Sequence, residues 1–119
     1  MGKKRLVLLP EVLEFLQGED VAVQIKFWVI AEELEGHGQL FMPHGRKLEQ
    51  NLFEIRVNEP EGNIRVFYVY EGASQLFGVH AYKKGTQKTP LKELRVARLR
   101  RTALERRLQE EEERHENHS

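Results

Sequence analysis

The chain has 119 residues and no net formal charge at pH 7, with 39% hydrophobic and 32% charged residues. This length allows one domain with a modest core, and this composition excludes a disordered chain and a membrane protein. The chain has no cysteine, which excludes disulfides and thiolate chemistry. Its basic start is followed by only four apolar residues, Leu6–Leu9, which does not fit a secretory signal. We therefore expect a cytoplasmic protein that contacts no membrane.

The N-terminal part predicts a short buried strand followed by a helix. Arg5–Leu9 is largely apolar and ends at Pro10, because proline cannot donate to a central ladder. Pro10 also suits the first turn of a helix. Apolar residues then recur at helical spacing up to Gly18, which should end this helix.

A second, longer helix is expected after Gly18. Asp20 can cap its start, and the helix should run to about Glu35 with Gly36 as its stop. A strand is the alternative, because apolar residues also alternate through Val21, Val23, Ile25, Phe27 and Val29. About fifteen residues is long for a strand and ordinary for a helix, so length favours the helix.

From Leu52 onward the hydrophobic period changes from helical to alternating. Strands are predicted at Leu52–Val57, Ile64–Tyr70 and Gln75–Tyr82. The segments between them, Asn58–Asn63 and Glu71–Ser74, contain glycine and are short enough for tight connections. Three consecutive strands joined in this way predict an antiparallel meander.

A polar, basic loop, Lys83–Thr89, leads into the last predicted helix. Thr89 can serve as its N-cap, and Pro90 fits its first turn. A partly apolar stripe follows, through Leu91, Leu94, Ala97, Leu104 and Leu108. Residues 109–119 offer nothing apolar to bury. We therefore expect one domain over residues 1–108 and a charged tail that frays or is disordered.

The predicted elements occur in the order strand, two helices, three strands and one helix. This order predicts an α+β fold. In it, a small antiparallel four-stranded sheet carries two N-terminal helices packed on it, and a C-terminal helix completes the domain.

The neutral total hides an uneven distribution of charge. Residues 1–40 carry four basic and seven acidic side chains, and residues 41–100 carry eleven basic and six acidic ones. The rest of the chain carries four basic and six acidic side chains. A basic centre between acidic flanks permits phosphate binding by one face of the protein.

The basic residues of this centre lie on the predicted meander and beside it. Arg56 and Arg65 flank the first hairpin and could project from the same face of the sheet. Further basic side chains precede and follow the meander, at Arg46, Lys47, Lys83, Lys84 and Lys88. Such a surface could hold a phosphodiester through bidentate guanidinium contacts. Arginine on a solvent-facing strand and lysine in a loop are also ordinary, so the pattern alone leaves a purely structural role open.

Several segments resemble the phage-derived branch of the RelE/HigB toxins. They are Gly38–Leu40 with Pro43, Leu52–Val57, Ile64–Tyr68 and Lys83–Pro90. In that family three motifs follow one another along the chain. The first is a strand that contains an aromatic residue, glutamate, an aliphatic residue and arginine. The second is a strand with arginine, an aliphatic residue and tyrosine, and the third is a lysine-rich loop that ends in Thr-Pro. The resemblance covers about residues 5–104, with Gly85 as an extra residue in the loop.

The resemblance implies the α+β fold described above and supports the second helix. It also implies ribosome-dependent cleavage of messenger RNA at the A site. The partner would be a cognate antitoxin, usually a helix-turn-helix protein. The reaction would use no metal and no cofactor, with the ribose 2′-hydroxyl as the nucleophile. The protein would then supply proton transfer and stabilise charge on phosphorus.

The resemblance further implies roles for single basic residues. Arg65 matches the family arginine that steadies the pentacovalent phosphate. Arg56 matches a basic position that helps to hold the scissile phosphate. Lys83 and Lys84 match the basic pair at the end of the last strand.

The chain departs from the family at two positions. Some members have a lysine where this chain has Glu54, and the catalytic tyrosine of the closing helix has no clear counterpart here. Tyr82 and His80 are candidate substitutes, because a phenol or an imidazole can move a proton.

Two other functions stay open at this stage. The first is a DNA gyrase poison on the same fold, as in the ParE relatives, although Arg56 and Arg65 suit a phosphate substrate better. The second is a catalytically inactive relative that binds RNA or the antitoxin, because the tyrosine is missing. Two features of the predicted helices also allow two interpretations each. Trp28 fits either the core or an antitoxin interface. The line Arg95, Arg98 and Arg101 fits either contact with ribosomal RNA or pairing with neighbours such as Glu105.

Overall fold

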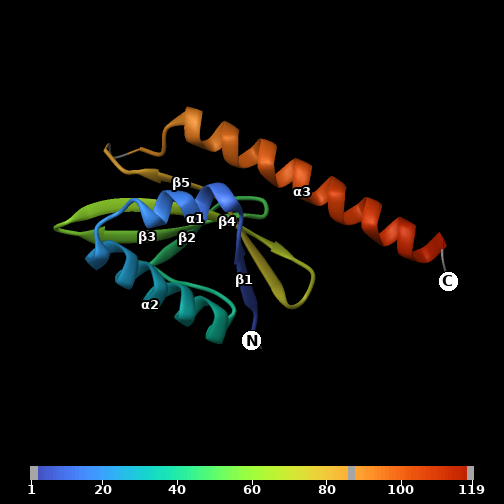
Figure 1. Cartoon of the computed structure of the whole chain (residues 1–119), viewed down its shortest axis with the longest axis horizontal. Helices are drawn as coiled ribbons and strands as arrows, with labels where there is room; N and C mark the ends of the chain where they lie inside the picture. The colour runs from blue at the N-terminus through green and yellow to red at the C-terminus, as the bar shows by residue number, and fades with distance from the viewer. Residues whose placement is uncertain (1–2, 86–87, 118–119) are drawn as a thin grey trace.

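A computed structural model describes residues 3–85 and 88–117, which form three helices and five strands (Figure 1). The strands are β1 (Arg5–Leu8), β2 (Gly45–Glu49), β3 (Leu52–Glu59), β4 (Gly62–Glu71) and β5 (Gln75–Lys83). The helices are α1 (Pro10–Gln17), α2 (Val21–His37) and α3 (Leu91–Asn117). All five strands form one sheet in the order β1-β5-β4-β3-β2.

The α+β class and the meander are confirmed, but the expected four-stranded antiparallel sheet is wrong. The sheet has five strands in the described part of the chain and is mixed, because β1 pairs in parallel with β5. The strand missing from the prediction is β2, which pairs antiparallel with β3. Its sequence, Gly-Arg-Lys-Leu-Glu, contains one large apolar residue and therefore shows no apolar alternation. Charged side chains of this kind are typical of an edge strand.

The two N-terminal helices form where the sequence predicts them. Oδ1 of Asp20 accepts a hydrogen bond from the Ala22 N–H at 2.9 Å, as expected of a cap. The predicted stop at Gly36 is wrong, because α2 continues to His37 and ends at Gly38. Gly38 has φ 79° and donates its N–H to the Leu34 carbonyl, the left-handed closure that glycine favours.

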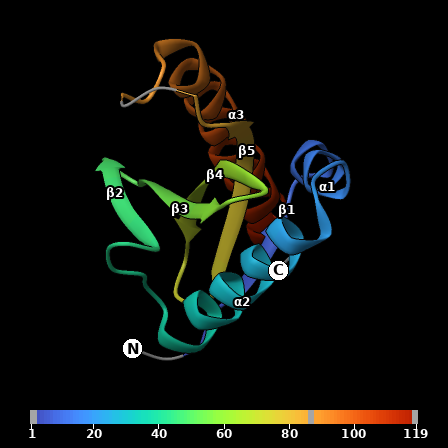
Figure 2. The same cartoon turned by 90° about the vertical axis from the view of Figure 1, so that its left-hand side faces the viewer.

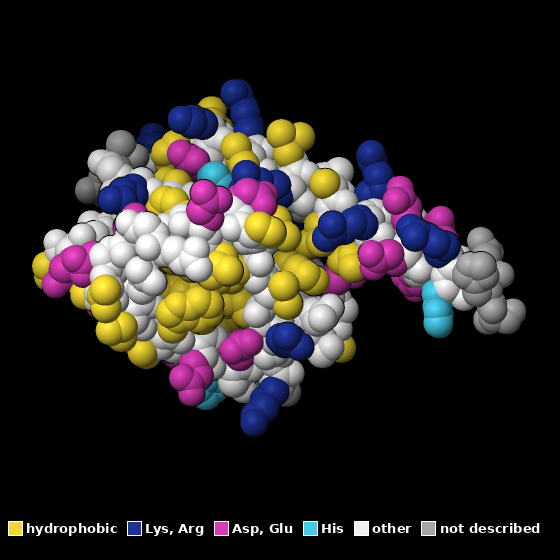
Figure 3. All heavy atoms as spheres, viewed as in Figure 1, with side chains coloured by type: hydrophobic (Ala, Val, Ile, Leu, Met, Phe, Trp, Pro, Cys, Tyr) yellow, Lys and Arg dark blue, Asp and Glu magenta, His cyan; other side chains and the backbone are white. Residues whose placement is uncertain are grey.

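The third helix begins one residue later than predicted and extends further. The Pro90 carbonyl accepts the first helical hydrogen bonds, from Glu93 and Leu94, so Pro90 and not Thr89 occupies the N-cap position. The helix continues to Asn117, through the stretch for which the sequence predicts fraying, because glutamate, glutamine and arginine are good helix formers. This end projects beyond the sheet (Figure 1), and charged side chains lie along it (Figure 3).

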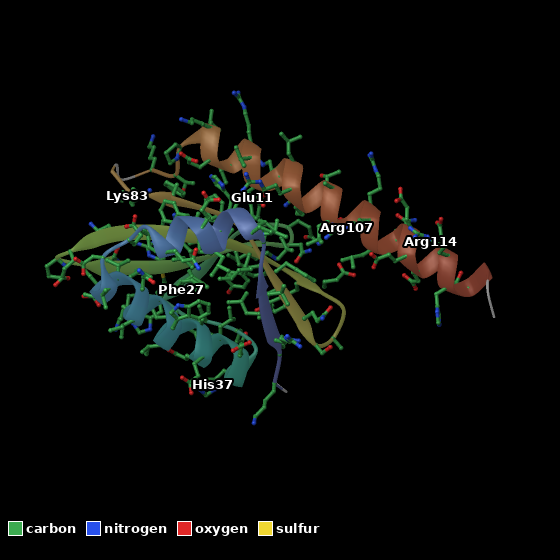
Figure 4. All side chains as sticks on the ribbon, viewed as in Figure 1. Glu11, Phe27, His37, Lys83, Arg107 and Arg114 are labelled. Atoms are coloured by element: carbon green, nitrogen blue, oxygen red, sulfur yellow. The ribbon has the colours of Figure 1, made fainter. Side chains whose placement is uncertain are left out.

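The two faces of the sheet are covered by different helices, as Figure 2 shows. The α1–α2 face carries the larger core, in which Phe27 lies between α2 and the sheet (Figure 4). The α3 face carries a smaller cluster made of Leu52, Phe67, Val69, Val79, Tyr82, Ala97 and Leu104. Within the described residues, no helix is both long enough and apolar enough to cross a bilayer.

Candidate functional site

Two arginines and a tyrosine form a row across three neighbouring strands. Arg56 of β3 pairs with Arg65 of β4, and Arg65 pairs with Tyr82 of β5. The strand neighbours Ile55 and Val57 belong to the α1–α2 core. Because side chains alternate along a strand, Arg56 points to the α3 face, where Tyr82 also packs. The sheet thus sets two guanidinium groups and a phenol side by side.

A second row lies next to the first on the same face. Arg46 of β2 pairs with Glu54 of β3, Glu54 pairs with Phe67, and Phe67 pairs with His80. His80 reaches this face because the register shifts opposite Phe67, which makes Val79 an extra residue in β5. Bulges of this kind re-aim side chains and are frequent beside functional sites.

Glu54 belongs to the second row, connects it to the first through Arg56, and is completely buried. Its Oε2 accepts hydrogen bonds from Nε of Arg46 at 2.6 Å and from Nη1 of Arg56 at 3.2 Å. The side chains of Arg46 and Arg56 are 41% and 20% exposed, so both reach solvent. One buried carboxylate therefore holds two solvent-reaching guanidinium groups in fixed positions.

From the sequence, Glu54 departs from the family pattern, and strand alternation predicts that it shares a face with Arg56, two residues away. The pairing of the two residues in the site agrees with that prediction. The second partner of Glu54, Arg46, could not be anticipated, because Arg46 lies on the strand that was not predicted.

Arg65 is held by neutral groups and not by a carboxylate. Its Nη1 donates to Oδ1 of Asn58 at 2.8 Å and to the Ile64 carbonyl at 2.9 Å. The residue is 4% exposed, and none of the described residues forms an ion pair with it. Burial lowers the pKa of this guanidinium, and the neighbouring Arg56 lowers it further. Arg65 therefore adds a buried positive charge that no direct contact neutralises.

Lys84 adds a fourth cation at the end of β5. Burial lowers the pKa of its ammonium group, and Arg65 is the next largest cause. We call Arg46, Glu54, Arg56, Arg65, Tyr82 and Lys84 the basic cluster. Its four cations and one carboxylate leave a formal surplus of three positive charges, and cations that lower one another's pKa favour an anion between them. The cluster can therefore hold a phosphate through guanidinium donors.

Buried polar atoms without hydrogen-bond partners gather at this cluster. Within the part of the chain that the structure describes, they are Glu54 Oε1, Arg56 Nε, Arg65 Nε, Tyr82 Oη and Thr89 Oγ1. A folded protein satisfies nearly all of its buried polar groups, so each exception needs an explanation. Four of these five belong to the basic cluster, and Thr89 is adjacent to the start of α3. Among the described residues, this cluster is therefore where buried side-chain polar groups are least satisfied.

Tyr82 and His80, the two candidates for proton transfer, are placed differently. Burial raises the pKa of the Tyr82 phenol, so this group stays protonated at neutral pH and can act only as a donor. Nε2 of His80 lies 2.7 Å from Oε1 of Glu93, and its Nδ1 lies 3.2 Å from Nη1 of Arg100. Because a guanidinium only donates, Nδ1 accepts and Nε2 donates. Both ring nitrogens of His80 therefore serve the contact between β5 and α3.

Two of the predicted RNA-binding lysines point away from the basic cluster. Nζ of Lys47 lies 5.8 Å from the ring centroid of Phe53, which packs on the α1–α2 core. Nζ of Lys83 lies 3.5 Å from Oε2 of Glu19, and Figure 4 shows Lys83 at the end of the sheet remote from the projecting end of α3. Because side chains alternate along a strand, Lys47 and its neighbour Arg46 point to opposite faces of the sheet.

The fourth predicted RNA-binding lysine, Lys88, lies in the loop between β5 and α3. Lys88 is exposed there. Thr86 and Gln87, which belong to the same motif, lie outside the residues that the structure describes. The loop starts at Lys84 and therefore begins in the basic cluster.

The arginines on α3 have a partner that the sequence did not reveal. Nη2 of Arg98 donates to Oε1 of Glu49 at 2.7 Å, and Nη1 of Arg101 donates to Oε2 at 3.1 Å. The hydrogen bond from Arg98 is the main cause that lowers the pKa of Glu49. The anticipated partner of Arg101, Glu105, lies further away at 3.9 Å. These two arginines tie α3 to β2.

A comparison with known families identifies one family that matches most of the chain. A family model described as Phage derived protein Gp49-like (DUF891) matches residues 14–102. The match takes in α2, the strands β2 to β5 and the whole basic cluster, which is more than half of the chain. The chain belongs to this family. The Gp49-like family is associated with toxins of the RelE/HigB type, and no curated protein matches the chain.

Proposed function

We propose that this Gp49-like chain is the toxin of a type II toxin–antitoxin system and cleaves messenger RNA on the ribosome without a metal ion. The observation that supports this proposal best is the basic cluster itself. It combines a surplus of three positive charges with buried polar atoms that have no partner among the described residues. Such a site needs an anionic, hydrogen-bonding ligand, and the RNA backbone has both properties.

The proposed reaction assigns one task to each side chain of the first row. Arg56 holds the scissile phosphate from the solvent side, and Arg65 stabilises the charge that develops on phosphorus. The ribose 2′-hydroxyl attacks phosphorus and releases its proton to solvent, while the bond from phosphorus to the 5′-oxygen breaks. Tyr82, whose raised pKa keeps it protonated, donates its proton to that leaving oxygen.

One observation favours a second candidate, an RNA-binding relative that does not cleave. Arg65 is 4% exposed, and its Nη1 is already engaged with Asn58 and Ile64. An arginine held in this way contributes positive potential without touching the phosphate. In that case the protein would bind RNA at the basic cluster and leave it intact.

Inducible expression in a bacterium, followed by primer extension on a translated message, tests the proposal. We expect cuts within translated codons for the native chain and for the matched control Lys47→Ala, which changes a cation on the opposite face. Arg65→Ala should abolish the cuts, and circular dichroism of the purified variant should show a native fold. Growth arrest with intact messages and damaged DNA would identify a gyrase poison, and RNA binding without cuts would identify the inactive relative.

A further inference from the structure

The α2 helix is apolar on the side that faces away from the sheet. Its inner side packs into the core through Val23, Phe27, Ile30, Ala31 and Leu34. Its outer side exposes Val21 (68%), Ile25 (60%), Trp28 (47%) and Val29 (56%), a set that we call the α2 stripe. A helix that covers a sheet needs only one apolar face. Single exposed apolar residues are ordinary, but four within about two turns mark an interaction surface.

The surroundings of the α2 stripe are acidic. Residues 10–37, which form α1 and α2, carry seven carboxylates and a single lysine, Lys26. Exposed carboxylates on the two helices include Glu14, Glu32 and Glu33. Glu11 and Glu19 instead contact Arg100 and Lys83, at 3.7 and 3.5 Å. Figure 3 shows acidic side chains close to apolar ones over the lower part of the molecule, where α2 runs in Figure 1, and basic side chains beside them near the N-terminus. The stripe is thus an apolar surface with an acidic rim.

The charge of this rim decides which occupant fits. A second copy docking through its own α2 would bring two acidic rims together, which is unfavourable. Anionic lipid and nucleic acid are repelled for the same reason. An amphipathic helix with apolar residues at i, i+4 and i+7 can cover the stripe, and lysine or arginine beside those positions would meet the acidic rim.

We infer that the α2 stripe is the docking site for a basic amphipathic helix of the protein that neutralises this toxin. The identity of this partner as an antitoxin rests on the proposed function. The apolar and acidic character of the surface does not depend on that function. The helix that carries the stripe, α2, lies on one face of the sheet, and α3 lies on the other (Figure 2). The basic cluster is on the α3 face. A helix docked on α2 therefore leaves the arginines uncovered, and partner binding and RNA cleavage are separable by mutation.

Trp28 makes the inference directly measurable. It is the only tryptophan of the chain, so fluorescence on titration reports on the stripe alone when the added peptide contains no tryptophan. The probe is a synthetic helical peptide with leucine at i, i+4 and i+7 and lysine at flanking positions, and its counterpart has glutamate in place of each lysine. The lysine peptide should shift the emission of Trp28 to the blue in a saturable way, and the glutamate peptide should not.

Variants of the full-length chain locate the binding. Ile25→Glu should weaken the lysine peptide at least tenfold, because it puts a charge into the centre of the stripe. The matched control is Leu99→Glu, which changes a 72% exposed apolar residue on α3 and should bind the peptide like the native chain. Equal binding by Ile25→Glu, or no response of Trp28 to the lysine peptide, would overturn the inference.

Sedimentation equilibrium of the chain alone tests the competing occupant. We expect a monomer over the whole concentration range. Self-association that Ile25→Glu abolishes would mean that a second copy covers the stripe, and it would overturn the inference. In cells, the native chain should be neutralised by its co-expressed antitoxin and Ile25→Glu should stay toxic, whereas neutralisation of Ile25→Glu would contradict the docking site.

RNA cleavage measured in parallel keeps the two proposals apart. Ile25→Glu should cleave messages as the native chain does, because the basic cluster lies on the other face. Cleavage that is absent from the native chain while the lysine peptide still binds at Trp28 would refute the nuclease and leave the docking surface standing. Cleavage without peptide binding would refute the docking surface and leave the nuclease standing.

Discussion

The two faces of the sheet are built from the same strands, but only the α3 face carries the basic cluster beside its apolar packing. On the α1–α2 face, the rings of Phe53 and Tyr68 stack with centroids 5.5 Å apart, and two helices close over them. On the α3 face, apolar packing covers one part of the sheet and the basic cluster occupies another. Because strand side chains alternate, neighbouring residues of one strand contribute to the apolar core on one face and to the basic cluster on the other.

The buried polar atoms sharpen this difference. The described side-chain atoms that are buried without partners lie at the basic cluster or at the adjacent start of α3. Unsatisfied groups of this kind lower stability and persist at functional sites, where a ligand can satisfy them. The α1–α2 face should therefore decide whether the chain folds, and the basic cluster should decide what the folded chain does.

The largest effect on stability is expected from Phe27→Ala on the α1–α2 face. The side chain is completely buried, and its loss should lower the free energy of unfolding by about 3–5 kcal/mol. Urea denaturation measures this change. The matched control is Trp28→Ala on the exposed side of the same helix, which should cost much less. An equal cost for both would show that the stripe is part of the core.

Tyr82→Phe should reduce RNA cleavage by about a hundredfold, because it removes the proposed proton donor. Thermal unfolding should show at most a small loss of stability, because the change removes one buried hydroxyl that neighbours the Thr89 side chain. Burial raises the pKa of Tyr82, so the native chain should lose this proposed donor only above about pH 10. Tyr68→Phe, on the opposite face, should leave cleavage unchanged, and a matching loss there would contradict the assignment.

Glu54→Gln should separate RNA binding from cleavage. Removing the carboxylate raises the surplus of the basic cluster by one charge, so single-stranded RNA should bind several-fold more tightly and with a steeper salt dependence, by about 0.7 in slope. Cleavage should fall, because Arg46 and Arg56 lose a charge-assisted anchor. Fluorescence anisotropy at several salt concentrations measures binding. Glu71→Gln, at the far end of β4, is the control, and weaker RNA binding by Glu54→Gln would contradict this account.

Glu49→Gln should lower stability by about 1 kcal/mol at neutral pH, because it weakens the link from β2 to Arg98 and Arg101. The arginines lower the pKa of Glu49 from its ordinary 4.5. The stabilisation is therefore complete above that value and is lost as the pH falls through the lowered pKa. Thermal unfolding at neutral and acidic pH should show the native chain and the variant converging in acid. A constant difference across pH would exclude the charge as the cause.

The smallest effect is expected from truncation after Leu108, which removes residues 109–119. The side chains of residues 109–116 are exposed, so stability should change by less than about 0.5 kcal/mol, and cleavage should not change. Calorimetry and the cleavage assay together test the predicted domain of residues 1–108. A large loss of stability would place the domain boundary further along the chain.

The sequence by itself determined the local elements. The hydrophobic period and the capping residue Asp20 predicted α1, α2 and the three meander strands. These signals were sufficient because a helix cap and the alternation along β3 to β5 each involve only a few neighbouring residues. Parity along the strands also predicted that Arg56 and Arg65 share a face, which the register confirms. These features depend on neighbouring residues, and a single chain segment contains all the information for them.

The tertiary structure alone decided the features that depend on distant partners. β2 is recognisable only through its pairing with β3, and β1 only finds its parallel neighbour once β5 is in place. The bulge at Val79 decides which face of the sheet His80 lies on. Glu54 positions Arg46 only because β2 pairs with the neighbouring strand β3. Strand order and register follow from the burial of whole faces, because a shift of one residue would reverse every side chain. No short sequence pattern specifies the strand order of the whole sheet.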